Sequence, residues 1–93
     1  MGRNASNIIY HELIGLKARI CSHTDVTLNG RSGIIVDETM NTLVLEDGVR
    51  TITVPKFGSR IIFKLPYKDV EVRGEMLVGR PEDRIKRLRG VVI

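Results

Sequence analysis

Two imidazoles and one thiol near the start of the chain are the side chains best suited to hold a metal ion or to act as a nucleophile. They are His11, Cys21 and His23, the last two forming a Cys-x-His pair. Zinc signatures place cysteines and histidines in two closely spaced couples, and this arrangement matches none of them. We therefore interpret Cys21 as a small buried thiol and the histidines as ordinary imidazoles, and we predict no metal site and no cofactor bound by this chain.

An adjacent pair of acids, Asp37 and Glu38, could serve acid–base catalysis or bind magnesium. The pair ends a β-branched run, and neighbouring residues of a strand point to opposite faces of a sheet. The two carboxylates are therefore not expected to converge. Residues 30–33 contain two glycines but lack the Lys-Ser/Thr ending of a phosphate-binding loop. The sequence thus offers no recognisable catalytic residues.

Basic side chains are concentrated in the second half of the chain. Residues 1–54 carry five basic and six acidic side chains, whereas residues 55–93 carry ten basic and five acidic ones. The formal net charge of +4 therefore comes entirely from the second half. Segregated positive charge favours a polyanionic partner, most commonly a nucleic acid. The alternative is an ordinary charged surface without a partner.

The low aromatic content limits how such a partner would be bound. Tryptophan is absent and aromatic residues make up only 4% of the chain, so the stacking platforms of single-strand readers are missing. We expect contacts from basic side chains to phosphates instead. The candidates are Lys56, Arg60, Arg80, Arg84, Lys86, Arg87 and Arg89. Three of these arginines share one face of a predicted helix, which favours binding over a merely solvated face.

Two short helices are predicted to flank the central part of the chain. Ser6 can cap a helix over about 7–14, in which apolar side chains recur at helical spacing. Pro81 can begin a basic helix over about 81–89, whose acids lie in the first turn and whose basic residues lie in the last.

Between these helices, short runs of alternating polarity follow one another closely, which is typical of antiparallel strands. The Asp47-Gly48 step predicts a two-residue hairpin turn between two of them. Closing the sheet would remove exposed edges that a chain this small could not cover. We therefore predict an all-β fold, a small antiparallel barrel of about six strands over about 17–79. The strands are expected at about 17–21, 33–38, 42–46, 50–54, 60–65 and 70–72, with short further strands at 26–28 and 76–78.

Length and composition exclude several protein classes. Ninety-three residues correspond to one domain, 1–93. The chain is 42% hydrophobic and 28% charged, close to the average for globular proteins. No apolar run is long enough to span a membrane, and no secretory signal is recognisable. A single cysteine cannot form an internal disulfide, so we expect a cytoplasmic protein without membrane contact.

Four stretches of the sequence resemble, in order, the signature blocks of one family. They are HELIGL at 11–16, GIIVDETMNTL at 33–43, VPK at 54–56 and RPEDR at 80–84. The resemblance extends over roughly residues 11–89. On these motifs the chain resembles protein component 1 of archaeal ribonuclease P, the counterpart of the Pop4-type eukaryotic subunit.

This resemblance implies an Sm-like barrel and a protein subunit without a catalytic site of its own. In that family an RNA, with magnesium, cleaves the 5′ leader from precursor tRNA. The protein subunits stabilise the RNA and aid substrate recognition. The implied partners are the ribonuclease P RNA, other protein subunits, especially the zinc-ribbon subunit, and precursor tRNA indirectly.

The resemblance also implies roles for particular residues. The central block is expected to form a polar turn that fixes two strands, through Asp37, Glu38, Thr39, Asn41 and Thr42. Among the basic candidates, Lys56, Arg80 and Arg84 fall within the family's motifs and are the leading RNA contacts. For the protein partner we expect contacts from the terminal helices, through Ile9, Leu13 and Ile85.

Other functions stay open on the sequence alone. A homo-oligomeric Sm-type RNA chaperone predicts a multimer in solution, whereas the ribonuclease P interpretation predicts a monomer until its partner is added. A ribosomal or translation-factor barrel predicts tight binding to ribosomal RNA. A small independent hydrolase predicts turnover without RNA, and no residues here would carry it.

Overall fold

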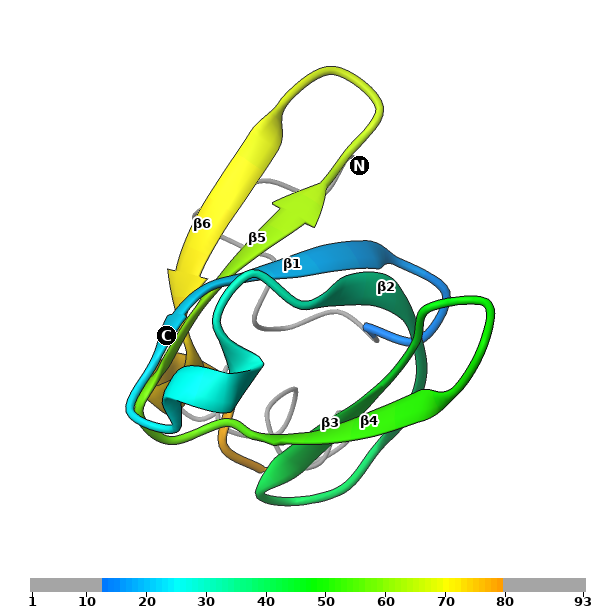
Figure 1. Cartoon of the computed structure of the whole chain (residues 1–93). Coiled ribbons are helices and arrows are strands. Elements are labelled where there is room, and N and C mark those ends of the chain that lie inside the picture. Colours follow the sequence, from blue (N-terminus) through cyan, green and yellow to red (C-terminus); the bar gives the residue numbers. More distant parts are fainter. Residues whose placement is uncertain (1–12, 80–93) are drawn as a thin grey trace, which may run out of the picture.

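The strands of this protein form one antiparallel sheet in a computed structural model that describes residues 13–79. The six strands have the order β4-β3-β2-β1-β5-β6, which confirms the predicted antiparallel sheet of about six strands. The sheet curves around one core, and the β5–β6 hairpin extends away from the curved body (Figure 1). The strands are β1 (Lys17–His23), β2 (Ser32–Glu38), β3 (Thr42–Glu46), β4 (Thr51–Pro55), β5 (Ser59–Lys64) and β6 (Asp69–Arg73).

The two edges of the hydrogen-bonded sheet are β4 and β6. The predicted closure of the barrel is therefore not shown within residues 13–79. After β4 the chain turns, and β5 pairs with β1 and β6 instead of with β4. Register shifts between Ile20 and Ser22 and between Ile35 and Asp37 interrupt β1 and β2. Such bulges increase the local twist and bend of a strand, in keeping with the curvature of the sheet.

Alternate residues of each strand face a single apolar core, as the polarity pattern predicts. In β1, Ala18 and Ile20 are buried, whereas Lys17 and Arg19 are exposed. This alternation places a continuous apolar surface on the inside of the curved sheet. The core consists of Leu13, Leu16, Ala18, Ile20, Leu28, Ile35, Leu43, Leu45, Val54, Ile61, Phe63, Val70, Val72 and Leu77.

Two segments that were predicted as short strands are 3₁₀ turns. The first, η2 (Val26–Leu28), is capped by Asp25, whose Oδ1 accepts the N–H of the second helical residue at 3.1 Å. This local hydrogen bond stabilises a turn in place of strand pairing. The second, η3 (Gly74–Leu77), follows β6 directly. Gly74 packs so closely against the Lys56 carbonyl that a side chain there would collide with it, and the chain turns at this point.

The hairpin predicted at Asp47-Gly48 is present, but its connection is longer than two residues and runs over 47–50. Gly48 has a φ of +95°, which favours glycine. Asp47 Oδ1 accepts the N–H groups of Arg50 and Val49, each at 2.9 Å. These backbone hydrogen bonds, from Arg50 first and Val49 second, lower the pKa of Asp47.

The predicted terminal helices lie outside the described residues, apart from residues 13 and 14 of the first. These two residues belong to a turn that continues through Gly15, which has a φ of +94° and donates its N–H to the Ile35 carbonyl at 2.7 Å. Within residues 13–79, no helix has the length and apolar character needed to cross a membrane.

Candidate functional site

The outer surface of β1, β5 and β6 gathers basic side chains. Lys17 and Arg19 on β1, Arg60 and Lys64 on β5, and Arg73 on β6 all alternate with core residues and are exposed. We name these five residues the basic face. The pairing register sets Lys17 opposite Lys64 and Arg60 opposite Arg73. Like charges in directly opposite positions repel, so this arrangement suits a polyanionic ligand that separates them.

Two acids partly offset the arginine half of the basic face. Arg60 Nη1 lies 3.3 Å from Glu71 Oε2, and Arg73 Nε lies 3.5 Å from Glu75 Oε2. Both arginine side chains remain more than half exposed, at 57% and 71%. Exposed ion pairs are weak, so both guanidinium groups stay accessible to a phosphate. The pKa of Glu75 is lowered, mainly because its carboxylate accepts the Gly58 N–H at 2.8 Å and less because of the Arg73 charge.

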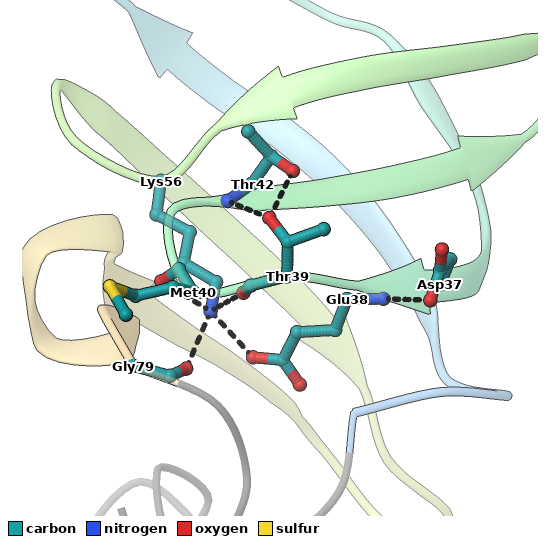
Figure 2. Close-up of polar contacts among 7 residues, drawn as sticks. All are labelled: Asp37, Glu38, Thr39, Met40, Thr42, Lys56 and Gly79. Atoms are coloured by element: carbon teal, nitrogen blue, oxygen red, sulfur yellow. Dashed lines mark hydrogen bonds and ion pairs between the residues drawn. The ribbon is translucent and has the colours of Figure 1, made fainter. Parts of the chain in front are cut away.

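Lys56, predicted to contact RNA, is buried inside the protein. Its side chain is 0% exposed, and its Nζ lies 2.7 Å from Glu38 Oε2. The ammonium also donates to the carbonyl oxygens of Thr39 at 2.8 Å, Met40 at 3.2 Å and Gly79 at 2.9 Å (Figure 2). The prediction for Lys56 is therefore wrong, because an ammonium enclosed by these acceptors cannot reach a phosphate.

These contacts make Lys56 a link between three segments that are distant in the sequence. Its own segment is the β4–β5 loop, and its acceptors come from the β2–β3 turn and from the segment after η3. The backbone reinforces the link, because the Lys56 N–H donates to the Asn41 carbonyl at 2.8 Å and the Gly79 N–H to the Met40 carbonyl at 2.7 Å. Ser59 Oγ donates to the Lys56 carbonyl at 2.6 Å. The cluster therefore fixes the position of Gly79, directly before the basic residues at 80–89.

The β2–β3 turn has the polar character that the family resemblance implies (Figure 2). Asp37 is exposed and its Oδ1 accepts the Glu38 N–H at 2.8 Å, whereas the Glu38 carboxylate turns inward to Lys56. Thr39 Oγ1 accepts the Thr42 N–H at 3.0 Å and lies 2.6 Å from Thr42 Oγ1. The adjacent acids diverge as expected for strand residues, so they form no paired-carboxylate site.

The cysteine and histidine of β1 have separate environments. Cys21 is exposed, not buried as predicted, because a bulge shifts the alternation of β1 at this point. His23 is buried, and its Nδ1 accepts the Asp25 N–H at 2.9 Å. Its Nε2 therefore carries the proton and donates to the Pro55 carbonyl at 3.0 Å. Within residues 13–79 no group of three potential metal ligands occurs, and His11 lies outside this range.

Several of the predicted contact residues lie outside the described residues. They are Arg80, Arg84, Lys86, Arg87 and Arg89 for RNA, and Ile9 and Ile85 for a protein partner. Leu13, also predicted to contact a protein partner, is 0% exposed and belongs to the core. That prediction is wrong for Leu13, because the turn before β1 folds its side chain into the protein.

Four members of the basic face were missed by the sequence analysis. They are Lys17, Arg19, Lys64 and Arg73. The strand pattern contained a usable signal for three of them, because it placed Lys17, Arg19 and Lys64 on the face of their strands that points away from the core. Arg73 follows the strand expected at 70–72. The pattern could not show that β1 lies beside β5, and this pairing is what brings the lysines together.

Comparisons with known proteins agree on one family. A family model described as "Ribonuclease P/MRP, subunit p29" matches residues 6–87. Ribonuclease P protein component 1 of Staphylothermus marinus is 42% identical over 90 residues, covering 95% of this chain and 98% of that protein. The protein of the same name from Methanocaldococcus jannaschii is 46% identical over 83 residues, covering 87% and 86%. The solved structure of Mth11, a homologue of human RNase P protein Rpp29, is similar with a TM-score of 0.60 and 49% identity, covering 81% of this chain and 99% of that one.

Proposed function

This chain belongs to the ribonuclease P/MRP subunit p29 family and is a protein subunit of archaeal ribonuclease P, and we propose that its basic face holds the phosphate backbone of the enzyme's RNA. As a ribonuclease P protein component, it partners the ribonuclease P RNA and other protein subunits. The observation that carries the proposal is the register, which sets Lys17 opposite Lys64 and Arg60 opposite Arg73 on an exposed sheet surface.

The chemistry of the basic face favours phosphate contacts over base reading. Its five side chains are all cations, which bind phosphates without distinguishing sequence. The exposed aromatic residues Phe57 and Tyr67 lie in loops, not on this face. Binding should therefore be strongly salt-dependent and should recognise the folded shape of the RNA.

Further parts of this proposal rest on the family. We propose that Arg80, Arg84, Lys86, Arg87 and Arg89 add phosphate contacts, because they share the positive charge of the basic face and follow Gly79 directly. We propose that Ile9 and Ile85 contact the zinc-ribbon subunit. We also propose Pop4-type kinship and an Sm-like barrel, which the curved sheet around one core supports (Figure 1).

The magnesium of the reaction is proposed to belong to the RNA, which would cleave the 5′ leader of precursor tRNA. This chain would then stabilise the RNA and contribute indirectly to the binding of precursor tRNA. We propose that it does so in the cytoplasm.

Reconstitution tests the proposal. The ribonuclease P RNA, the other protein subunits and this chain are combined, and cleavage of precursor tRNA is measured at limiting magnesium with and without the chain. Omission should reduce cleavage, and no effect in a full protein set would overturn the proposed support of the RNA.

Variants test the surface. Arg60→Ala and Arg73→Ala should each weaken RNA binding. Each should also reduce the slope of the logarithm of the binding constant against the logarithm of the salt concentration by the contribution of about one phosphate contact. Lys68→Ala, an exposed lysine in the β5–β6 loop, is the matched control. If neither arginine variant differs from this control, the basic face is not the RNA-binding surface.

A further inference from the structure

We propose that a hollow beside the basic face binds one ribonucleotide of the RNA backbone, with its phosphate on Lys17 and Lys64 and its 2′-hydroxyl on Glu46. This inference rests on the proposed function and adds to it a way of distinguishing RNA from DNA. The hollow has a volume of about 660 Å³ and is lined by these three residues together with Arg19 and Ile34, among others. That volume lies within the usual range of ligand-binding clefts, about 300–1,000 Å³.

One row of residues across four strands builds the hollow. The register pairs Lys64 with Lys17, Lys17 with Ile34, and Ile34 with Glu46. Directly paired residues project from the same face of a sheet, so these four side chains border the same space. Neighbouring strands lie about 4.8 Å apart, so the backbones at Lys17 and Glu46 are separated by about 10 Å. A sugar can lie between them over the Ile34 side chain, which is 43% exposed.

The positive charges of Lys17 and Lys64 are less neutralised by nearby acids than those of Arg60 and Arg73. Arg60 and Arg73 each have an acid within 3.5 Å. Among residues 13–79, Lys17 and Lys64 form no ion pair, although Asp69 is the register neighbour of Lys64 on β6. Two lysines in directly opposite positions destabilise a strand pair. A phosphate between them would remove this repulsion, which gives the arrangement a physical reason.

The acidic end of the hollow has one carboxylate available for a ligand. Asp47 is already used by the β3–β4 turn, where it accepts the N–H groups of Val49 and Arg50. Within the described part of the chain, the Glu46 carboxylate has neither an ion pair nor a hydrogen bond. A carboxylate repels phosphates and acidic peptides but accepts a hydrogen bond from a hydroxyl. The Lys17 and Lys64 ammonium groups therefore suit the phosphate of a ribonucleotide, and the Glu46 carboxylate, about the width of a sugar away, suits its 2′-hydroxyl. DNA lacks this hydroxyl group.

The first experiment maps the ligand on the full chain. A single-stranded oligoribonucleotide and the deoxy oligonucleotide of the same sequence are titrated into ¹⁵N-labelled protein. The amide signals of residues 17, 34, 46 and 64 should shift with RNA and shift less with DNA. Shifts that fall elsewhere would overturn the inference, as would shifts of these amides caused by an acidic peptide but not by RNA.

The second experiment separates the two ends of the hollow by affinity. The double variant Lys17→Ala/Lys64→Ala should bind both oligonucleotides about tenfold more weakly, with Lys68→Ala as the control. Glu46→Ala should lower the preference for RNA over DNA about fivefold to tenfold. Glu71→Ala removes the same charge outside the hollow and should leave that preference unchanged. Equal preferences in Glu46→Ala and Glu71→Ala would refute the role of Glu46.

The failure of this inference can be told from the failure of the proposed function. If the unaltered chain supports precursor-tRNA cleavage and Arg60→Ala and Arg73→Ala weaken RNA binding while all the variants of the hollow behave as their controls, the hollow is not a nucleotide site. The proposed support of the RNA then stands on Arg60 and Arg73 alone. If the unaltered chain neither binds the ribonuclease P RNA nor changes cleavage, both are overturned.

Discussion

Replacing Lys56 by methionine would remove one ammonium from the centre of the cluster that joins the β2–β3 turn to Gly79. Methionine keeps a similar unbranched stem, so the change is mainly electrostatic. The Glu38 carboxylate would lose the cation 2.7 Å away while its side chain remains 1% exposed. The carbonyl groups of Thr39, Met40 and Gly79 would each lose the ammonium as a donor.

The expected cost follows from this burial. Removing one partner of a buried ion pair typically costs about 3–5 kcal/mol, because the remaining desolvated charge loses a close counter-charge. In a domain of this size each kcal/mol lowers the melting temperature by about 4–8 °C, so Lys56→Met should lower it by at least about 12 °C. Natural domains unfold with only about 5–15 kcal/mol, so this loss would remove between about one fifth and all of such a domain's stability.

Urea unfolding followed by circular dichroism measures this effect, with Lys64→Met as the matched exposed control. The double variant Lys56→Met/Glu38→Leu removes both charges and should recover much of the loss, since replacing a whole buried pair by apolar residues is often nearly neutral. A Lys56→Met variant that loses no more stability than Lys64→Met would refute the buried-pair reasoning. A double variant that is no more stable than the single one would show that the hydrogen bonds to the carbonyls, not the ion pair, dominate.

Three further predictions concern stability. Leu13→Ala should cost about 2–5 kcal/mol in urea unfolding, because Leu13 is a core residue; a loss below about 1 kcal/mol would show that it is not. The pKa of Asp47 lies below its ordinary value of 3.8, so its stabilising effect is complete above about pH 4 and is lost as the pH falls through the folded-state pKa. In acid unfolding, the free energy of unfolding of Asp47→Asn should therefore fall less steeply as the pH is lowered. An unchanged dependence of this free energy on acidic pH would contradict the role of the turn hydrogen bonds of Asp47. Gly74→Ala should lower the melting temperature, because the added methyl group meets the Lys56 carbonyl; differential scanning calorimetry that shows no decrease would mean that this packing is loose.

Local sequence patterns were enough to predict most of the strands. The alternation of Ala18 and Ile20 with charged residues identified β1 and its buried face, and the same reasoning identified the strands that follow. The pattern failed at 26–28 and 76–78, where Asp25 capping and the packing of Gly74 replace strand pairing by 3₁₀ turns. In both places a specific hydrogen bond or a close contact overrides an apolar pattern that is too short to decide.

The charge count directed the prediction of RNA contacts to the basic second half of the chain and included Lys56, which is buried. Lys56 follows a strand and lies in the basic half, so its sequence context resembles that of an exposed cation. Its burial depends on Glu38, which is brought to it by the turn between β2 and β3. A contact between residues so far apart in the sequence cannot be read from local spacing.

Local patterns were sufficient to identify the antiparallel strands and the buried face of each strand, and four motifs in order were sufficient to identify the family. These properties depend on neighbouring residues or on fixed short blocks. Which charges are buried, and which of them face one another, depends on the tertiary structure. The pairing of β1 with β5 sets Lys17 opposite Lys64, and the packing of the β2–β3 turn encloses Lys56. Strand order and register arise from contacts across the whole chain, and they separate a lysine that stabilises the protein from those that can meet RNA.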